Sequence, residues 1–157
     1  MNPEQLVEQT AMPNEGYLDK SVEEAFRWKE IIRDIESMRG SLAAKALYLV
    51  VFESTRNEDA NRELIAALDQ AAHEEAKESP ALLHYYADTP DENGRSRSWC
   101  LWLDDKSARA AVGGPAHQEA MSRTREFYGT NYAVKLFSVI PHDEGITFVP
   151  HSHPRTT

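Results

Sequence analysis

The chain has 157 residues, of which 41% are hydrophobic and 27% are charged, a composition typical of one globular core with an extension. Its formal net charge of −9 argues against a nucleic-acid partner, because phosphate contacts need clustered Lys and Arg. Cys100 is the only cysteine, which excludes an intrachain disulfide and a cysteine-based zinc site. Residues 1–5 lack the basic head of a signal peptide and no run approaches the ~20 apolar residues of a membrane span, so we expect a cytoplasmic protein that does not bind membranes.

The first 40 residues divide into an arm and a helix. Residues 1–20 are polar and interrupted by proline and glycine, so this arm is expected to need a partner to become ordered. Ser21 and Glu24 then form a capping box, and apolar residues recur at helical spacing as far as Gly40. The sequence therefore predicts one helix from Ser21 to the Arg39–Gly40 pair.

After this helix, one pattern occurs twice: an apolar run, a charged turn into an amphipathic helix, and a second apolar run. The apolar runs are residues 46–52, 81–86, 98–103 and 132–140, with helical segments around residues 64–68 and 120–121. Two such units in tandem predict an α+β fold of the ferredoxin-like βαββαβ type. The N-terminal helix has no place in that unit, so we expect it outside the domain or against another subunit. The predicted divisions are 1–42 (arm and helix), 43–141 (ferredoxin-like domain) and 142–157 (C-terminal extension).

Several segments refine this prediction. The helix over residues 58–77 has a strongly acidic outer face, which is either a solvated surface or a docking surface. Residues 88–94 carry a dense turn signal that predicts a hairpin. Gly113 and Gly114 interrupt the second helical segment before Pro115, and residues 146–149 predict a short fifth strand.

The stretches Trp102-Leu103-Asp104-Asp105-Lys106-Ser107-Ala108 and Gly114-Pro115-Ala116-His117-Gln118-Glu119-Ala120-Met121 resemble the second half of the antibiotic-biosynthesis-monooxygenase-like domains. These domains belong to the dimeric α+β barrel superfamily, in which a strand often ends on Trp and then continues into a helix through a small residue, Pro and His. The resemblance covers about residues 46–140. It implies a homodimer in which two four-stranded sheets face each other. Activities in that superfamily include cofactor-independent oxygenation of aromatic polyketides, haem degradation and lactone isomerisation.

The need to cover both faces of the sheet also predicts a dimer, independently of the resemblance. A sheet with helices on one side only would expose aromatic side chains on the other side, in a patch too large for a stable monomer. Haem-degrading relatives carry a haem-ligating His where Met121 aligns, and an Asn on the first strand that is missing between Ala46 and Glu53. We therefore expect no cofactor.

Alternation along the strands predicts which side chains face a cavity. The cavity set is His84, Tyr86, Trp102, Lys135 and Phe137, a mostly aromatic lining with a few polar groups that suits a flat organic ligand. If the interior were close-packed, with no pocket of about 300 Å³, catalysis would be disfavoured. An open pocket on which His84 and Lys135 converge would favour an enzyme.

Three members of this set are candidates for catalysis. His84 is the candidate general base, since an ordinary imidazole titrates near working pH. Tyr86 or Lys135 would stabilise a developing oxyanion. The alternative is that His84 is a hydrogen-bonded edge residue and Lys135 a surface side chain.

Three further positions carry side chains with possible chemistry. His117 lies near a buried helical stripe and is a candidate substrate contact, although a packed or capping histidine is the commoner role. Cys100 shares a strand face with Trp102 and is an inert packing residue or a substrate contact. His142, His151 and His153 match no zinc spacing, so no metal site is expected.

Two functions follow from these observations. The first is a cytoplasmic homodimer that binds a small hydrophobic or aromatic molecule, as a cofactor-independent monooxygenase or isomerase. The second is a non-catalytic binding or assembly protein whose N-terminal helix and acidic face dock a partner. A sheet face covered by the N-terminal helix would favour the second.

Overall fold

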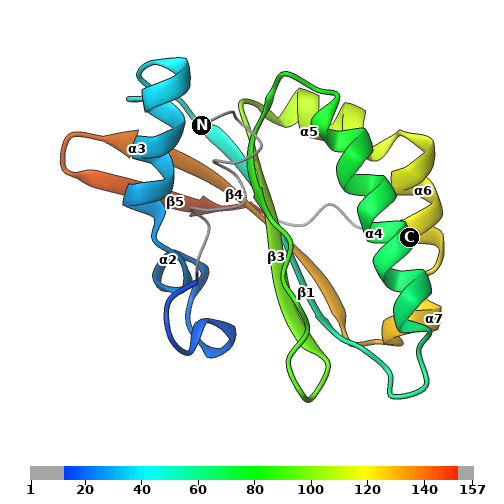
Figure 1. The fold of residues 1–157 in the computed structure, drawn as a ribbon. Helices are drawn as coiled ribbons and strands as arrows, with labels where there is room; N and C mark the ends of the chain where they lie inside the picture. The colour runs from blue at the N-terminus through cyan, green and yellow to red at the C-terminus, as the bar shows by residue number, and fades with distance from the viewer. Residues whose placement is uncertain (1–12, 152–157) are drawn as a thin grey trace.

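The computed structural model describes residues 13–151, which form one five-stranded sheet between two layers of helices (Figure 1). The strands are β1 (Leu47–Thr55), β2 (Leu82–Tyr86), β3 (Arg95–Trp102), β4 (Tyr132–His142) and β5 (Gly145–Pro150). The helices are α2 (Val22–Ala25), α3 (Trp28–Arg39), α4 (Arg62–Lys77), α5 (Asp105–Val112), α6 (Pro115–Ser122) and α7 (Thr124–Tyr128), preceded by a short 3₁₀ helix, η1 (Tyr17–Asp19).

The strand order β2-β3-β1-β4-β5 confirms the predicted ferredoxin-like topology. All neighbouring strands are antiparallel, and the central strand β1 pairs Val50 with Cys100 of β3 and with Leu136 of β4. The predicted fifth strand is also present, as a hairpin partner of β4. The first four strands therefore form the βαββαβ unit, and β5 extends the sheet beside β4.

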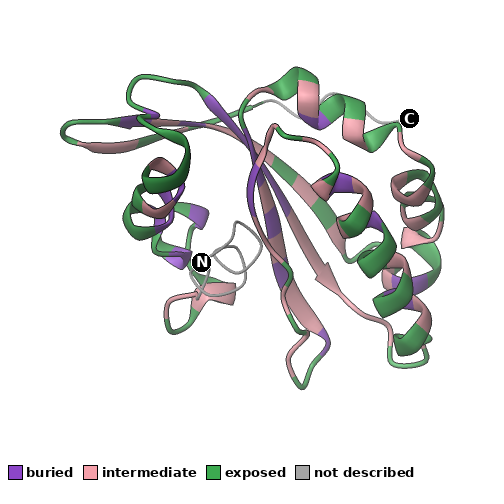
Figure 2. Cartoon of the chain, turned by 45° about the horizontal axis from the view of Figure 1, so that its top comes forward, coloured by how far each residue is buried: buried purple, intermediate pink, exposed green. Residues whose placement is uncertain are grey.

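The two faces of the sheet are covered by different helices. On what we call the α4 face, Tyr48, Val50 and Trp102 pack under the helical layer that contains α4 and α5. On the opposite face, the α3 face, Leu49 and Trp99 form one buried cluster with the residues of α2 and α3. Figure 2 shows the buried residues in the central strands and on the inner sides of both helical layers.

The covered α3 face corrects a sequence-based expectation. The predicted homodimer rested partly on a sheet face left bare, but Ile31, Ile32 and Ile35 of α3 fill that face within the same chain. Much of the apolar surface that would have required a second copy is therefore covered on the α3 face of the described residues. The predicted division at residue 42 stays a prediction, although α3 shares its core with the sheet.

The N-terminal helix is also shorter than predicted, because the chain breaks into two helices at Phe26. Ser21 caps α2 by accepting a hydrogen bond from the Glu24 N–H. Phe26 then adopts an extended backbone, and its ring contacts Trp28, Tyr86 and Trp99 edge-on. The extended backbone at Phe26 accompanies this buried ring, so packing overrides the helical periodicity of the sequence here. Of the predicted arm, residues 1–12 lie outside the described residues.

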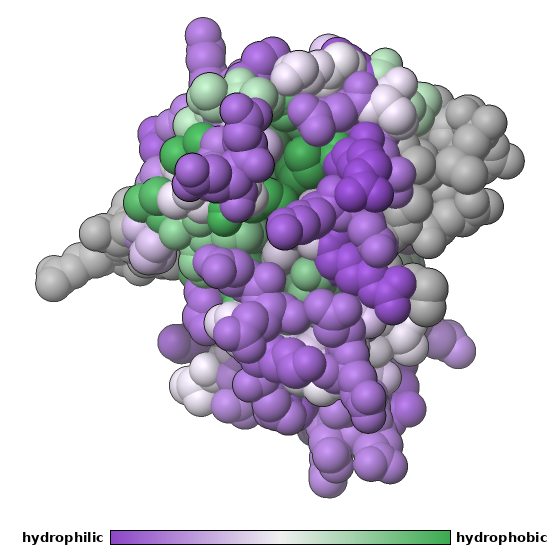
Figure 3. All heavy atoms as spheres, turned by 90° about the vertical axis from the view of Figure 1, so that its left-hand side faces the viewer, coloured by the Kyte–Doolittle hydropathy of each residue, from purple (hydrophilic) through white to green (hydrophobic). Residues whose placement is uncertain are grey.

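A shallow cleft of about 420 Å³ remains beside α2 and α3, next to β5. Its floor includes Phe26, Trp28, Ile146 and Phe148, and charged side chains of α2 and α3 form its rim. Figure 3 views this side of the molecule, where hydrophobic residues lie in a hollow between hydrophilic ones.

Candidate functional site

The predicted catalytic residues lie on the α3 face but do not meet. His84 on β2 and Lys135 on β4 are separated by three strand spacings of about 4.8 Å each, because β3 and β1 lie between them. His84 is fully buried and stacks on Trp99, with ring centroids 5.4 Å apart. This burial lowers the pKa of His84 to about 4, so the imidazole is neutral at ordinary pH. The condition that would favour an enzyme, an open pocket on which His84 and Lys135 converge, is therefore not met in the described residues.

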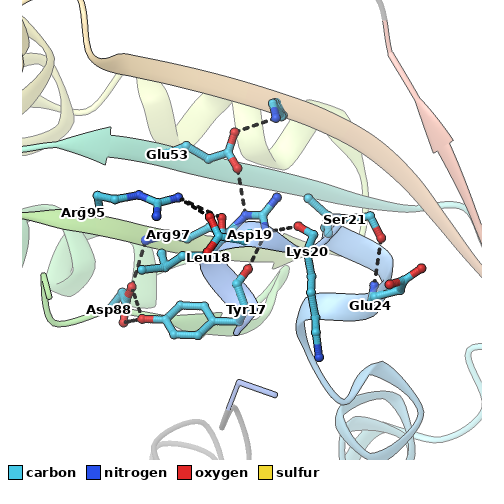
Figure 4. Close-up of polar contacts among 12 residues, drawn as sticks. Tyr17, Leu18, Asp19, Lys20, Ser21, Glu24, Glu53, Asp88, Arg95 and Arg97 are labelled. Carbon is cyan, nitrogen blue, oxygen red and sulfur yellow. Dashed lines mark hydrogen bonds and ion pairs between the residues drawn. The ribbon is translucent and has the colours of Figure 1, made fainter. Parts of the chain in front are cut away.

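Lys135 belongs to an ion-pair network with Glu53 and Arg97, and Figure 4 labels the latter two side chains. Its ammonium lies 2.6 Å from one carboxylate oxygen of Glu53, and the Arg97 Nε lies 2.8 Å from the other. Arg97, which is only 4% exposed, also donates hydrogen bonds to the backbone carbonyls of Tyr17 and Lys20. This buried guanidinium therefore fixes the N-terminal segment on strand β3.

Tyr86 takes part in the same attachment of the N-terminal segment. Its hydroxyl and that of Tyr17 both donate to the Asp88 carboxylate, at 2.7–2.8 Å, and the Arg97 backbone N–H donates to the same group. Burial, followed by the hydrogen bond to Asp88, raises the pKa values of both tyrosines well above their ordinary range. Tyr86 is thus a partly buried donor to Asp88, and Figure 4 shows Asp88 and Tyr17 side by side.

Trp102 and Cys100 lie on the α4 face, opposite to the predicted orientation. Residues directly paired across strands share a face, and β1 pairs Tyr48 with Trp102 and Val50 with Cys100. Because Tyr48 and Val50 pack under the helical layer, their partners do so as well. Phe137, in contrast, lies on the α3 face and packs edge-on against Phe148.

A cavity of about 140 Å³ lies on the α4 face, between the sheet and helices α4, α6 and α7. Apolar side chains line much of it, including Ile65, Leu68, Met121 and Phe127. Polar groups from five elements also reach it, namely Asp69, His73, Cys100, His117, Tyr128 and Tyr132. Of the residues predicted as site residues, this cavity brings together Cys100 and His117.

Helix α4 supplies the longest wall of the cavity. Asn61 caps its first turn by accepting a hydrogen bond from the Leu64 N–H, at 3.0 Å. The cavity-lining positions then recur every three or four residues, at Ile65, Leu68, Asp69, Ala72, His73 and Ala76. The helical repeat that buries the apolar stripe therefore also carries Asp69 and His73 to the cavity.

The local surroundings shift the titration of these two polar groups. Asp69 keeps an exposed edge at the rim of the cavity, but the protein packed around it raises the pKa of its carboxyl to about 6. His73 stacks on Tyr85, and burial, followed by the nearby His117, lowers its pKa. The surroundings therefore disfavour the charged form of each side chain, although a carboxyl with a pKa of about 6 is still largely ionised at neutral pH.

His117 on α6 is held by a carboxylate from α4. Its Nδ1 lies 2.8 Å from the Glu75 Oε1, and both side chains are about four-fifths buried, with exposed fractions of 20% and 19%. The same carboxylate accepts hydrogen bonds from the backbone N–H groups of Ala116 at 2.9 Å and His117 at 3.1 Å. Glu75 therefore caps the first turn of α6 and orients the imidazole at the same time.

Gly114 makes room for this carboxylate. A Cβ atom at Gly114 would lie 2.2 Å from the Glu75 Oε1, closer than real atoms approach. The Gly113-Gly114-Pro115 sequence noted above thus has a packing reason: Pro115 starts the helix, and Gly114 admits the capping side chain. Sequence reasoning missed Glu75, because it lies 42 positions before His117 and looked like part of an acidic helix face.

The described histidines near the C-terminal end contact neighbouring strands, and the His151 ring also packs edge-on against Tyr48. His142 Nε2 lies 2.8 Å from the Thr147 hydroxyl, and His151 Nε2 lies 2.6 Å from the Ser138 hydroxyl. His153 lies outside the described residues. Within residues 13–151, no group of three potential ligands is arranged to hold a metal ion, and no helix is long and apolar enough to cross a membrane.

A family model described as PB2B2.08-like matches residues 4–150. The chain belongs to the PB2B2.08-like family. The match includes the N-terminal region as well as the sheet, so α2 and α3 are part of what this PB2B2.08-like chain shares with its family. A search of curated protein sequences finds no significant match.

Solved structures share the fold of the PB2B2.08-like chain at low sequence identity. The protein Rv0793 from Mycobacterium tuberculosis is 15% identical, with a TM-score of 0.51 over 58% of this chain and 92% of its own. A candidate antibiotic biosynthesis monooxygenase from Nitrosomonas europaea is 12% identical, with a TM-score of 0.52 over 60% of this chain and 90% of its own. The antibiotic-biosynthesis-monooxygenase-like fold predicted from the sequence is thereby confirmed. About two fifths of the PB2B2.08-like chain lies outside it.

Proposed function

We propose that the protein binds one small, flat, largely apolar molecule in the cavity of the α4 face. The observation that carries this proposal is the combination of apolar walls with a few polar groups, including His117 and Asp69, which reach the cavity from different elements. Ligand sites in proteins have this composition, because the apolar walls supply affinity and the polar groups fix orientation.

The volume limits the size of the ligand. A dry cavity of about 150 Å³ is known to hold benzene, whereas sites for drug-sized ligands start near 300 Å³. The cavity of about 140 Å³ therefore fits one substituted aromatic ring. A larger ligand would require α6 and α7 to move away from the sheet.

The named activity of one structural neighbour suggests the kind of chemistry. That neighbour is described as a candidate antibiotic biosynthesis monooxygenase. Cofactor-independent oxygenation and isomerisation both begin by removing a proton from the substrate, and the cavity holds side chains that exchange protons. In its finer form, the proposal is that the protein is a cofactor-independent monooxygenase or isomerase that acts on an aromatic or hydrophobic substrate.

The alternative is a non-catalytic docking protein, which gains support from the sheet face that the N-terminal helix covers but not from the surfaces it assigned to docking. It assigned partner binding to the N-terminal helix, but the buried side chains of α3, including Ile31 and Ile35, contact this chain's own sheet. The acidic side of α4 is exposed, as solvated helix faces commonly are. A homodimer through the α3 face would require α3 to leave the sheet.

A cavity-filling variant tests the binding proposal. Phenol and indole are titrated into the protein while amide chemical shifts are followed by NMR. Ala72→Leu fills the cavity and is expected to abolish the shifts around α4 and α6. Ala66→Leu, on the exposed side of the same helix, is the matched control and should bind like wild type.

Ala120→Leu provides a second filling variant on α6, in case Ala72→Leu does not fold. Binding that survives in a folded filling variant would overturn the proposal, as would shifts confined to the α3 face. No binding of either probe by the wild-type protein would count against an aromatic ligand of this size.

A further inference from the structure

Glu75 and His117 have the geometry of an oriented acid–base pair. Hydrogen bonds lower the pKa of the Glu75 carboxyl, chiefly the one from the Ala116 N–H and then the one from the His117 ring, so Glu75 is ionised. An ionised carboxylate only accepts hydrogen bonds. The proton in the 2.8 Å contact therefore lies on the His117 Nδ1, which fixes the tautomer of a neutral imidazole.

The tautomer decides which nitrogen a ligand would meet. With Nδ1 protonated, Nε2 carries the lone pair and acts as a proton acceptor. Within residues 13–151, no hydrogen bond engages Nε2, and the His117 side chain lines the cavity. The imidazole thus offers its basic nitrogen to the volume in which we place the ligand.

The pair is also rigid. Three contacts hold the Glu75 carboxylate, two of them from the backbone of α6 itself, and the missing side chain of Gly114 gives it access. The imidazole and its partner therefore keep their mutual orientation without a bound ligand. Preorganisation of this kind is what general-base catalysis requires, because the base must be aligned before the proton moves.

We infer that Glu75 and His117 form a proton-transfer pair, and that the ligand of this cavity carries a weakly acidic O–H group of the phenol or enol class. This inference rests on the proposed function, because it places the ligand in the same cavity. His117 is the catalytic residue, and Glu75 is a positioning residue that acts through it.

The step is a proton transfer without any oxidant or reductant. The O–H bond of the ligand breaks, its electron pair stays on the oxygen, and the proton forms a new N–H bond at the His117 Nε2. The products are a bound phenolate or enolate and an imidazolium ion. The Glu75 carboxylate at Nδ1 offsets the new positive charge, as a buried carboxylate does in other oriented histidine pairs.

Other titratable groups line the same cavity and influence the proton-transfer equilibrium between the ligand and His117. From α4 these are Asp69 and His73, and the remaining elements contribute Tyr85, Cys100, Tyr128 and Tyr132. Burial shifts the pKa values of His73, Cys100, Tyr128 and Tyr132 toward their neutral forms, so His117 is the main group that offsets the charge created on the ligand. Asp69, when ionised, opposes that charge from the rim of the cavity.

The probe 4-nitrophenol tests the inference, because it has one ring, an acidic O–H group and a coloured phenolate. Binding is measured by NMR at a pH where the free probe is neutral, and ionisation is measured separately by the phenolate absorbance. The bound probe is expected to ionise about one to three pH units below the free probe, the range produced by a neighbouring opposite charge. His117→Gln should bind the probe but lose this shift, while the control His142→Gln, on the far hairpin, should keep it.

Glu75→Gln separates positioning from folding. An amide at position 75 can still accept from the backbone of α6, but it can donate to the His117 Nδ1 and so reverse the tautomer. We expect the nitrogen chemical shifts of His117 to report this reversal and the ionisation shift of the probe to fall with it. A probe that binds without any ionisation shift would overturn the inference and leave the proposed function standing. A probe that does not bind would count against the proposed function itself.

Discussion

The indole ring of Trp28 on α3 packs against that of Trp99 on β3, with ring centroids 4.7 Å apart and ring planes at 48°. The Trp28 Nε1 also donates a hydrogen bond to the Val22 carbonyl, so this side chain joins α2, α3 and the sheet. We predict that Trp28→Ala destabilises the protein by roughly 3–5 kcal/mol, the usual cost of emptying a buried aromatic site. Urea unfolding measures the change.

Met38→Ala is the matched control on the same helix. Met38 is 44% exposed, so its truncation should cost less than about 0.5 kcal/mol. Deletion of residues 1–40 extends the test, because it uncovers the α3 face and should abolish cooperative thermal unfolding. A truncated chain that still unfolds cooperatively would show that α3 is peripheral.

Burial of His84 predicts a loss of stability in acid. Its pKa falls from 6.5 to about 4 in the folded protein, so the fold prefers the neutral imidazole. This preference contributes about 3 kcal/mol to the free energy of unfolding. The contribution is complete above pH 6.5 and is lost as the pH falls from there through 4. The measurement is the free energy of unfolding across this range for wild type and His84→Gln.

The two proteins are compared by how steeply the free energy of unfolding changes with pH, because His84→Gln also changes packing and so shifts the free energy at every pH. The slope should be shallower in His84→Gln than in wild type, while His142→Gln, an exposed histidine, should leave it unchanged. Equal slopes in all three proteins would mean that His84 titrates normally.

The two neighbouring glycines should respond in opposite directions to alanine. A Cβ at Gly114 would lie 2.2 Å from the Glu75 Oε1, so Gly114→Ala should cost about 1–3 kcal/mol through overpacking. At Gly113 the nearest atom would be 3.4 Å away and the backbone is helical, so Gly113→Ala should be neutral or stabilising by up to about 1 kcal/mol. Thermal unfolding of both variants measures the difference.

A double mutant identifies the cause of the destabilisation expected for Gly114→Ala. In Glu75→Ala the clash partner is gone, so adding Gly114→Ala should cost little further stability. A Gly114→Ala effect that is the same in both backgrounds would assign it to the backbone and not to the carboxylate.

Cys100 should be unreactive while the protein is folded. Burial raises the pKa of its thiol to about 12, so almost no thiolate is present at mildly alkaline pH. We expect iodoacetamide to label Cys100 only in urea, as detected by intact mass. Rapid labelling under native conditions would show instead that the cavity side of β3 is open to reagents.

The topology could be read from the sequence because its signals are local. Each apolar run and each amphipathic helix is visible within about ten residues, and two tandem units leave few arrangements. The break at Phe26 was not visible, because the helical repeat continues through it and only packing against Trp99 reveals the extended turn.

The sequence did not show on which face of the sheet each alternating set of strand side chains lies. On β3 both alternating sets are apolar, with Trp99 and Leu101 on one side and Cys100 and Trp102 on the other, so alternation alone did not say which set faced the helices. A basic imidazole in the cavity also depends on Glu75, whose partner is distant in sequence. The small-residue, Pro and His pattern at 114–117 was the one signal that pointed to this place.

The contact between Trp28 and Phe148 has a consequence for how the chain is made on the ribosome. Their rings lie 5.5 Å apart, and they come from the first long helix and from the last described strand. During synthesis the apolar stripe of α3 is therefore finished long before the strands that cover it. Nascent chains that stop before the strands of the sheet are complete would present this stripe to solvent, where chaperones and other exposed chains bind apolar surfaces.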